Sequence, residues 1–298
     1  MIIIGAGMAG LIAANYFRKQ NPVVYEKQEA LPDNHAALLR FKTHKVFDIC
    51  GIRAKKVKVH KSIVWDLDFM SGCNPYLANK YSQKVIGSIA DRSIWNTASE
   101  DRFIASENFI QQLASGVNIR MGIAVEPKMH HNPPIISTMP MPVLMRQLGW
   151  PNIPEFKFKP IWVFTGTIPD CDVNQTIYFP GPAFPTYRAS IVGSRFIAEM
   201  AYEPDTVLAH IDEVIDFFGV EKVEDDSFRK QAYGKILPID DQLRKEFMFW
   251  ATEKFGIYSL GRFATWRQIQ LDDVADDIIA IDRMMNSNYD HKKVFASQ

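Results

Sequence analysis

Cysteine is scarce in this sequence. Its 298 residues contain only three, Cys50, Cys73 and Cys171, which lie far apart and are odd in number. Their number and spacing argue against a disulfide framework and against a paired-cysteine zinc or redox site. The adjacent His130 and His131 would face opposite ways on a strand, so we expect no metal site there. A reducing, cytoplasmic compartment fits this cysteine usage best.

Net charge is also lacking, because 34 Lys and Arg residues balance 34 Asp and Glu residues. We therefore expect no global field that attracts a polyanionic partner. No window reaches the roughly 18 uninterrupted apolar residues of a membrane span. The apolar stretch at 1–14 lacks the basic region of a secretory signal. By contrast, 47% of the residues are hydrophobic, including 20 Phe and 6 Trp, which is ample for a globular core.

The first ten residues, MIIIGAGMAG, are typical of a dinucleotide-binding motif. An apolar strand runs into three spaced glycines, and a helix is expected after them. The first glycine permits a tight turn, the second lets the backbone approach a pyrophosphate, and the third lets helix and strand pack closely. The helix N-terminus faces the phosphate charge. The motif residues expected at the cofactor are Gly5, Gly7, Met8, Ala9 and Gly10.

An acid at the end of the second predicted strand completes this motif. In the run PVVYEK at 22–27, Glu26 ends the predicted strand, about 20 residues after the glycines, where a carboxylate bonds a ribose hydroxyl. Its neighbour Lys27 is expected at the same site. The acid disfavours the 2′-phosphate of NADP, because two anions would meet there. FAD and NAD both remain open on this motif alone.

The remaining chain alternates strand and helix patterns. Predicted strands lie at 54–65, 117–126 and 134–142, and predicted helices at 106–116, 206–219 and 271–285. These patterns predict an α/β protein with a doubly wound nucleotide-binding domain assembled from discontinuous segments. An inserted domain with a mixed sheet and helices should bind the substrate. The expected segments are 1–60, 105–150 and 250–298 for the first domain, and 61–104 and 151–249 for the second.

The segment GIYSLGRFATWRQIQLDDVADDI at 256–278 is the second informative motif. It predicts a strand that ends in Gly261 and Arg262, a short connection and then a helix. Here the chain resembles the amine-oxidase and UDP-galactopyranose-mutase superfamily of FAD enzymes. The resemblance implies that the glycine–arginine pair lies beside the flavin pyrophosphate. It also implies that the helix directs its N-terminus, with Asp273 and Val274, at the flavin ring, where its dipole stabilises negative charge.

Two further segments resemble the same superfamily. The run AVEPKMHHNPPIISTMPMPVLMRQL at 124–148 is similar to its pair of central strands. On this resemblance, the backbone of Val125 contacts adenine. The run YFPGPAFPTYRAS at 178–190 is similar to a mutase segment, which implies that Tyr187 and Arg188 face the substrate.

Further candidate site residues lie where the sequence departs from the superfamily's motifs, and among residues to which no role has yet been given. The superfamily's double-glycine arginine motif is replaced by NHAALLRFKTHKVFDICG at 34–51, in which Arg40 is expected to contact phosphate. His35 should lie along the flavin, either as a catalytic group or as a polar loop residue. Trp266 is a candidate for stacking on the flavin or for the core. The five basic residues of RAKKVKVHK at 53–61 indicate an edge strand protected by lysines or a phosphate-binding surface.

Together these features predict an FAD-dependent enzyme that acts on a small-molecule or nucleotide-containing substrate. Our first choice is oxidation or cleavage at a carbon–nitrogen centre, since such reactions often need no strong side-chain base and no catalytic dyad is visible. One alternative is a mutase-like, non-redox reaction on a nucleotide sugar. Another is action on a modified nucleobase in nucleic acid, as in some phage DNA hypermodification. A flavin-binding partner protein without enzymatic activity is the last.

Overall fold

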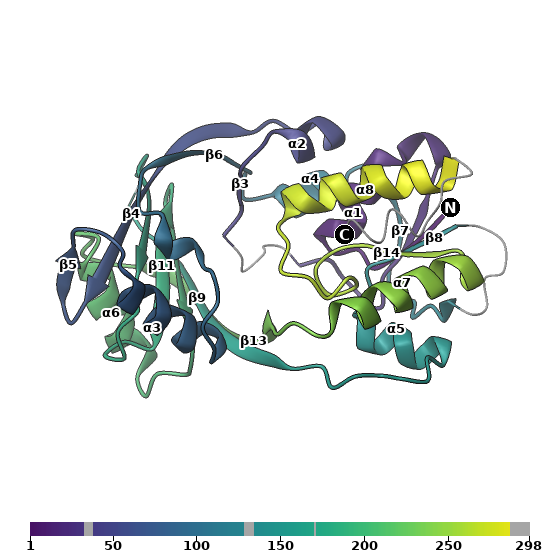
Figure 1. Ribbon diagram of the computed structural model, residues 1–298. Helices are drawn as coiled ribbons and strands as arrows, with labels where there is room; N and C mark the ends of the chain where they lie inside the picture. Colours follow the sequence, from purple (N-terminus) through teal and green to yellow (C-terminus); the bar gives the residue numbers. More distant parts are fainter. Residues whose placement is uncertain (33–37, 128–133, 170, 287–298) are drawn as a thin grey trace.

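The computed structural model describes residues 1–32, 38–127, 134–169 and 171–286. Within them the chain forms two β-sheets, which belong to two units that lie next to each other (Figure 1). Sheet A is entirely parallel, and sheet B is mixed. Among these described residues, no helix is both long and apolar enough to cross a membrane.

Sheet A is assembled from the beginning, the middle and the end of the chain. Its strands are β1 (Ile2–Ile4), β2 (Val23–Tyr25), β7 (Asn118–Arg120), β8 (Ile135–Ser137) and β14 (Ile257–Ser259). They pair in the order β14–β8–β1–β2–β7, and every pair is parallel. The three strands β1, β8 and β14 are buried along their whole length, as expected for a parallel sheet that is covered on both faces.

Helices cover both faces of sheet A (Figure 1). One side carries α1 (Met8–Tyr16), α2 (Lys45–Cys50), α4 (Phe109–Ala114) and α8 (Leu271–Asn286), which contact one another. The other side carries α5 (Met141–Leu148) and α7 (Asp241–Phe255). A short 3-10 helix, η1 (Arg18–Gln20), follows α1. The predicted doubly wound α/β unit from discontinuous segments is confirmed.

Two predicted strands are too long. The expected strand at 117–126 forms only β7, which ends at Arg120. The expected strand at 134–142 ends at Ser137, and α5 begins at Met141. Pro140 is the N-cap of this helix, and Pro142 lies in its first turn. Proline fits that turn because its fixed φ matches the helix and its missing N–H needs no partner there. The prolines therefore begin a helix where we expected the strand to continue.

Sheet B contains nine strands. They are β3 (Arg40–Phe41), β4 (Lys55–Trp65), β5 (Asp68–Met70), β6 (Glu100–Ile104), β9 (Phe158–Thr167), β10 (Asn174–Tyr178), β11 (Thr186–Val192), β12 (Arg195–Met200) and β13 (Glu224–Ile236). The order is β13–β9–β12–β11–β10–β4–β6–β3, with β5 paired to β4. Only β10 and β4 run parallel; the other pairs are antiparallel.

The two units are joined at both edges of sheet B. β3, β4 and β6 connect them along one edge, and β9 and β13 along the other (Figure 1). The expected domain boundary at residue 60 falls inside β4, whose hydrogen bonds to β6 and β10 keep the whole strand in sheet B. The expected boundary at residue 249 falls inside α7, which contacts β14 of sheet A.

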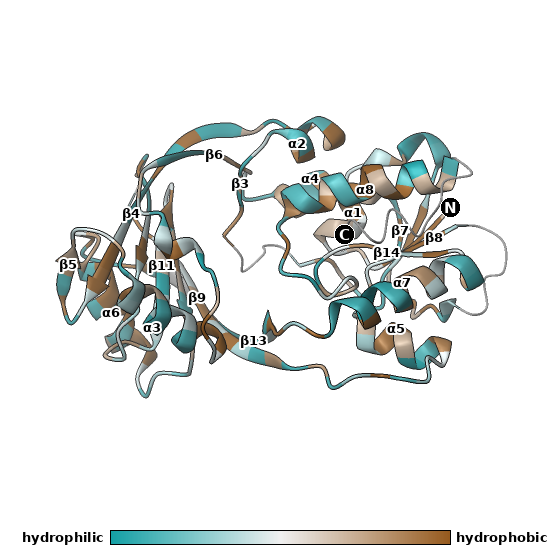
Figure 2. Ribbon diagram, viewed as in Figure 1, coloured by the Kyte–Doolittle hydropathy of each residue, from teal (hydrophilic) through white to brown (hydrophobic). Residues whose placement is uncertain are grey.

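Each face of sheet B has its own apolar core. The helix α6 (Val207–Asp216) covers one face through Ile211, Val214 and Ile215. The opposite face is covered in part by α3 (Pro75–Ile86) and the 3-10 helix η2 (Ser93–Trp95). Figure 2 shows that the first half of β4, which carries the lysines of 53–61, is mostly hydrophilic.

Candidate functional site

The glycine motif adopts the geometry that the sequence predicts. Gly5 has φ +97°, and a Cβ atom there would lie 2.1 Å from Thr138 Oγ1. A Cβ at Gly10 would lie 2.0 Å from the carbonyl oxygen of Gly5, so helix and strand approach too closely for a side chain. At Gly7, the N-cap of α1, a Cβ would meet nothing within 4 Å. The space outside Gly7, at the helix N-terminus, is therefore open to a ligand.

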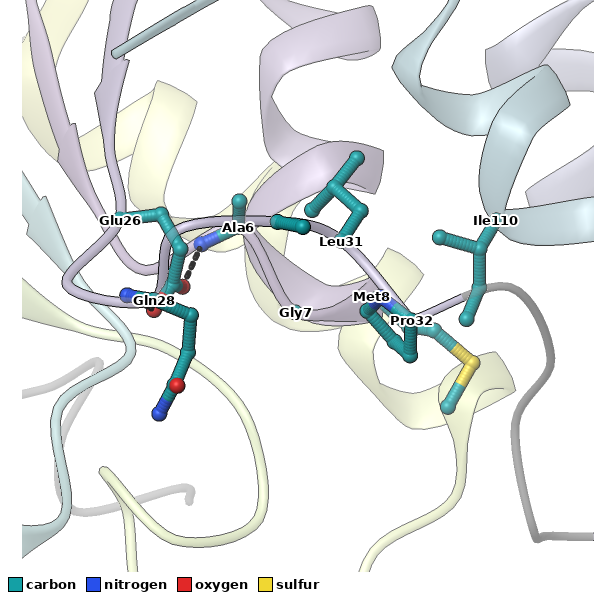
Figure 3. Close-up of a pocket in the computed structure, with 9 residues that line it drawn as sticks. Ala6, Gly7, Met8, Glu26, Gln28, Leu31, Pro32 and Ile110 are labelled. Carbon is teal, nitrogen blue, oxygen red and sulfur yellow. Dashed lines mark hydrogen bonds between the residues drawn. The ribbon is translucent and has the colours of Figure 1, made fainter. Parts of the chain in front are cut away.

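Glu26 lies on the same pocket as this open space. Its carboxylate accepts a hydrogen bond from the backbone N–H of Ala6 at 2.8 Å and one from Gln28 at 3.0 Å (Figure 3). The pocket has a volume of about 120 Å³. Its lining consists of Ala6, Gly7, Met8, Glu26, Gln28, Ala30, Leu31, Pro32 and Ile110. A carboxylate held by two N–H groups keeps lone pairs for a ribose hydroxyl.

Two predicted cofactor residues are absent from the lining of this pocket. Lys27 follows Glu26 and is exposed, whereas Val125 is buried in the core of the first unit. The turn before Val125 is fixed to the end of β2, because the N–H of Gly122 donates to the carbonyl of Gln28. Backbone contacts of Val125 to adenine stay a prediction.

The C-terminal motif packs against the N-terminal one. Gly261 follows β14 with φ +92°, and a Cβ atom there would lie 2.9 Å from the Cβ of Ala9. This close approach brings the loop after β14 to the first turn of α1. The next residue, Arg262, donates from Nη2 to the carbonyl of Gly234 at 3.0 Å, while its buried Nε has no partner among the described residues. Burial lowers the pKa of Arg262.

The loop that follows ties sheet B to the first unit. The indole N–H of Trp266 donates to the carbonyl of Leu237 at 2.9 Å, and its ring packs edge-on against Phe156 at 4.7 Å. Gln268 donates to the carbonyl of Ile236. Trp266 is 3% exposed and thus belongs to the core of this connection. Its stacking on a flavin stays a prediction.

The start of α8 has a structural partner in the loop before α2. Asp272 accepts hydrogen bonds from the N–H of Lys42 at 3.0 Å, and from the N–H and hydroxyl of Thr43 at 2.9 and 2.7 Å. Asp273 accepts from the N–H of Gln270 at 2.7 Å, and Val274 is buried. These bonds fix the N-terminal turn of the helix.

The structure places Arg40 on sheet B. Its guanidinium donates to the hydroxyl of Thr176 and to the carbonyls of Gln175 and Ile191, the latter two at 3.0 and 2.9 Å. Burial, together with the nearby charge of Arg188, lowers its pKa to about 9. Arg40 therefore fixes the segment after β2 to the strands of the second unit. Its expected phosphate contact stays a prediction.

Tyr187 and Arg188 point to the same partner. Adjacent residues of a regular strand face opposite ways, but β11 has a register shift between Thr186 and Arg188. Such a bulge places two residues opposite one. As a result, the hydroxyl of Tyr187 donates to Glu199 Oε1 at 3.1 Å, and Arg188 forms an ion pair with Glu199 Oε2.

Glu199 is a buried carboxylate held by this pair. Burial is the largest single effect and by itself would raise its pKa. The charges of Arg188 and Lys235, together with the hydrogen bonds from Arg188 and Tyr187, outweigh it and lower the pKa to about 2. The same interaction raises the pKa of Arg188, against the effect of its own burial. The carboxylate is thus ionised, and it fixes the guanidinium and the phenol in one orientation.

Three more cations lie near this carboxylate. The ammonium of Lys235 on β13 is 5.0 Å from the centre of the Tyr187 ring, and Arg262 and Arg92 are close enough to affect the pKa of Lys235. We name this group the charged cluster. Its members are Tyr187, Arg188, Glu199, Lys235, Arg262 and Arg92. It combines four basic side chains with one carboxylate, between sheet B and the loop after β14.

Sequence reasoning did not find Glu199, Lys235 or Arg92. The sequence could have pointed to two of them. Glu199 is a single acid in the apolar run FIAEMA, and Lys235 is a single base between Gly234 and apolar residues. Isolated charges in a buried strand pattern are unusual unless they have a partner. Arg92 carried no such signal.

The basic strand is an edge strand over only part of its length. In the strand order β4 lies between β10 and β6, but residues 55–58 pair with β6 alone, because β10 pairs with β4 only from Val59 onward. The edge interpretation therefore holds for the first half of the strand and is wrong for the second. Acids on β6 neutralise part of its charge: Lys56 pairs with Asp101 at 2.7 Å, and Lys61 pairs with Glu100. Sequence alternation correctly indicated a half-exposed strand, but the pairing of strands was not visible in it.

The remaining histidine candidates lie outside the described residues. His35 falls in 33–37, and His130 and His131 fall in 128–133. Elsewhere in the part of the chain that the structure describes, no group of His, Cys, Asp and Glu is arranged to hold a metal ion.

Comparison with known proteins identifies the fold. No family model and no curated protein matches the sequence. A crystal structure of reduced UDP-galactopyranose mutase matches with a TM-score of 0.69 and 15% identity, over 98% of this chain and 95% of that chain. This chain shares the fold of that mutase. The resemblance seen in the sequence is therefore confirmed at the level of the fold.

Other solved structures share this fold at lower TM-scores. A geranylgeranyl bacteriochlorophyll reductase-like protein from Thermoplasma acidophilum has a TM-score of 0.56 and 12% identity, over 99% of this chain and 81% of that one. Aklavinone-11 hydroxylase, solved with FAD and aklavinone, has a TM-score of 0.52 and 11% identity, over 95% of this chain and 61% of that one. At these identities the match concerns the fold alone.

Proposed function

We propose that this chain is an FAD-dependent enzyme. The observation that carries the proposal is the open space at Gly7, which lies at the N-terminus of α1 and on the same pocket as the Glu26 carboxylate. Backbone N–H groups at a helix N-terminus bind a pyrophosphate, and the carboxylate binds a ribose hydroxyl. Gly261 and Arg262 come to the same turn from the C-terminal motif. The residues therefore fit the group that the fold implies.

Substitution of Gly7 by Val tests this assignment. The purified protein should be yellow and should release FAD, not FMN, on heating. Gly7→Val should lose the flavin, because its side chain would occupy the pyrophosphate space. Gly72→Val is a matched control, since a Cβ there also meets nothing within 4 Å and its φ is not positive. A colourless wild type, or full flavin content in Gly7→Val, would contradict the assignment.

For the substrate, we infer an anion such as a nucleotide sugar, handled in a mutase-like reaction. Four basic side chains and one carboxylate form the charged cluster, and this balance repels a cationic amine while it attracts a phosphate. Arg188 is oriented by Glu199, and a fixed guanidinium binds phosphate in a directional, bidentate way. The bound flavin would supply the reactive ring, while the chain orients the substrate against it and excludes water.

The two other enzymatic readings have less support. Oxidation at a carbon–nitrogen centre, our first choice from the sequence, would require a site that tolerates an amine, which the charged cluster does not favour. Action on a nucleobase in nucleic acid was suggested by the basic strand, but Asp101 and Glu100 pair with its lysines.

Binding of UDP to the FAD-loaded protein tests the substrate class. Arg188→Gln should weaken UDP binding at least about tenfold, the effect of losing one charge-assisted contact, while flavin content stays normal. Arg229→Gln, an exposed arginine on β13, should change the affinity by less than about twofold. Absence of UDP binding, combined with anaerobic bleaching of the flavin by a simple amine, would favour the carbon–nitrogen reading instead.

A further inference from the structure

Lys235 occupies a specially built position on β13. The register of β13 against β9 shifts between Gln231 and Lys235. At Gly234 the backbone approaches Ile161 so closely that a Cβ atom would lie 2.4 Å from its Cγ1. Only glycine fits there, and the irregularity directs the next side chain toward the ring of Tyr187 at 5.0 Å.

The backbone on both sides of Lys235 is fixed by the first unit. Arg262 donates to the carbonyl of Gly234, Gln268 to that of Ile236 and Trp266 to that of Leu237. Three side chains from one loop thus hold the strand at three positions. The lysine is therefore placed by the same loop that carries the Gly261 motif.

Its ammonium has no anionic partner in this position. The charged groups around it come from several elements, and the nearest carboxylate, Glu199, is already bound by Tyr187 and Arg188. Among the described residues, no side-chain hydrogen bond or ion pair involves the ammonium of Lys235. The groups that surround it are Glu199 on β12, Tyr187 and Arg188 on β11, Arg262 after β14, Arg92 before η2, and its ladder partner Lys159 on β9.

We propose that Lys235 binds the anionic group of the ligand and takes up a proton as that group enters. Lys235 is half-buried, and its ammonium presents three unused N–H donors, among cations, to an acceptor that the described chain itself does not supply. A phosphate or another compact anion supplies both the acceptor atoms and the compensating charge. The inference rests on the proposed anionic substrate and adds the residue that couples its binding to protonation.

The direction of the pH dependence follows from the electrostatics. Burial lowers the pKa of Lys235 to about 7; Glu199 opposes this shift, and Arg188, Arg262 and Arg92 add to it. An anion in the cluster favours the charged form and raises this pKa. At about pH 8 the free lysine is mostly neutral and the bound one is charged, so binding takes up about one proton. At about pH 6 both forms are charged and the uptake is close to zero.

Calorimetry on the FAD-loaded protein measures this uptake directly. UDP is the probe, because its phosphates are already ionised at about pH 8, and two buffers with different ionisation enthalpies give the number of protons exchanged. Wild type should take up about one proton. Lys235→Met should take up none and bind at least about tenfold more weakly at about pH 6. Lys235→Arg should bind without proton uptake, because a guanidinium stays charged.

Two controls separate the possible outcomes. Lys230→Met changes an exposed lysine on the same strand and should behave like wild type. If UDP binds wild type without proton uptake and Arg188→Gln still weakens it, the Lys235 inference is overturned while the proposed function stands. If UDP does not bind at all, both fail. Proton uptake that persists in Lys235→Met would assign it to another group and also overturn the inference.

Discussion

Replacement of Glu199 by Gln should destabilise the protein by about 3 kcal/mol near neutral pH. The carboxyl has an ordinary pKa of 4.5, and in the folded protein its pKa is about 2. The difference of about 2.5 units corresponds to about 3 kcal/mol, at about 1.4 kcal/mol for each unit. The Glu199 side chain is only 12% exposed, so solvent screens this interaction little. Gln keeps an acceptor for Tyr187 but leaves Arg188 without its counter-charge.

The pH dependence separates the charge from the shape of the side chain. Because the folded pKa is depressed, the stabilisation is complete above 4.5 and is lost as the pH falls from there toward 2. The difference in unfolding free energy between wild type and Glu199→Gln should therefore shrink by about 1.4 kcal/mol between about pH 6 and pH 3.5.

Urea denaturation at these two pH values, with the same excess of FAD, measures that difference. The exposed Glu221→Gln should change the unfolding free energy by less than about 0.5 kcal/mol at either pH. If Glu199→Gln costs the same free energy at both pH values, the ionised pair is not what stabilises the fold. If it costs nothing, the arrangement around Arg188 is wrong.

Further expectations concern helices and the long strand. Asp272→Ala should lower the free energy of unfolding by about 2 kcal/mol in urea denaturation, because three donors lose their acceptor. Asp276→Ala, on the same helix but exposed, should lower it by less than about 1 kcal/mol. The ammonium of Lys84 donates to three backbone carbonyls between the end of β10 and the start of β11. Lys84→Met should therefore lower the free energy of unfolding by about 3 kcal/mol and speed proteolysis of this connection. Unchanged cleavage would contradict this role. The double variant Lys56→Ala/Lys58→Ala should give the same gel-shift titration with DNA as wild type. A clear loss of DNA binding in the double variant would revive the nucleic-acid reading.

The motif at the beginning of the chain could be predicted because its requirements are local. Gly5, Gly10 and Glu26 all lie within the first 26 residues. Gly5 is needed by a backbone turn, Gly10 by a helix–strand contact, and Glu26 by two nearby N–H groups. Apolar spacing likewise predicted the helices α6 and α8, since a helix buries the residues that recur every three or four positions.

The charged cluster depended on contacts that no local pattern encodes. Alternation along β11 would place Tyr187 and Arg188 on opposite faces, and only the bulge against β12 brings both to Glu199. Arg40 was expected at the phosphate, but the strand order of sheet B gives its guanidinium acceptors on β10 and β11. Such register and strand pairing arise from hydrogen bonds between distant segments.

The sequence by itself thus determined the dinucleotide motif and the α/β character of the first unit, because glycine conformation and helical periodicity act over a few residues. Tertiary structure alone decided which side chains meet between the two units. Lys235, Glu199 and Arg262 are separated by up to 63 positions in the sequence, and they come together only when β13, β12 and the loop after β14 pack. Their charges then acquire their altered pKa values from burial and from one another, which is a property of the folded arrangement and not of any segment.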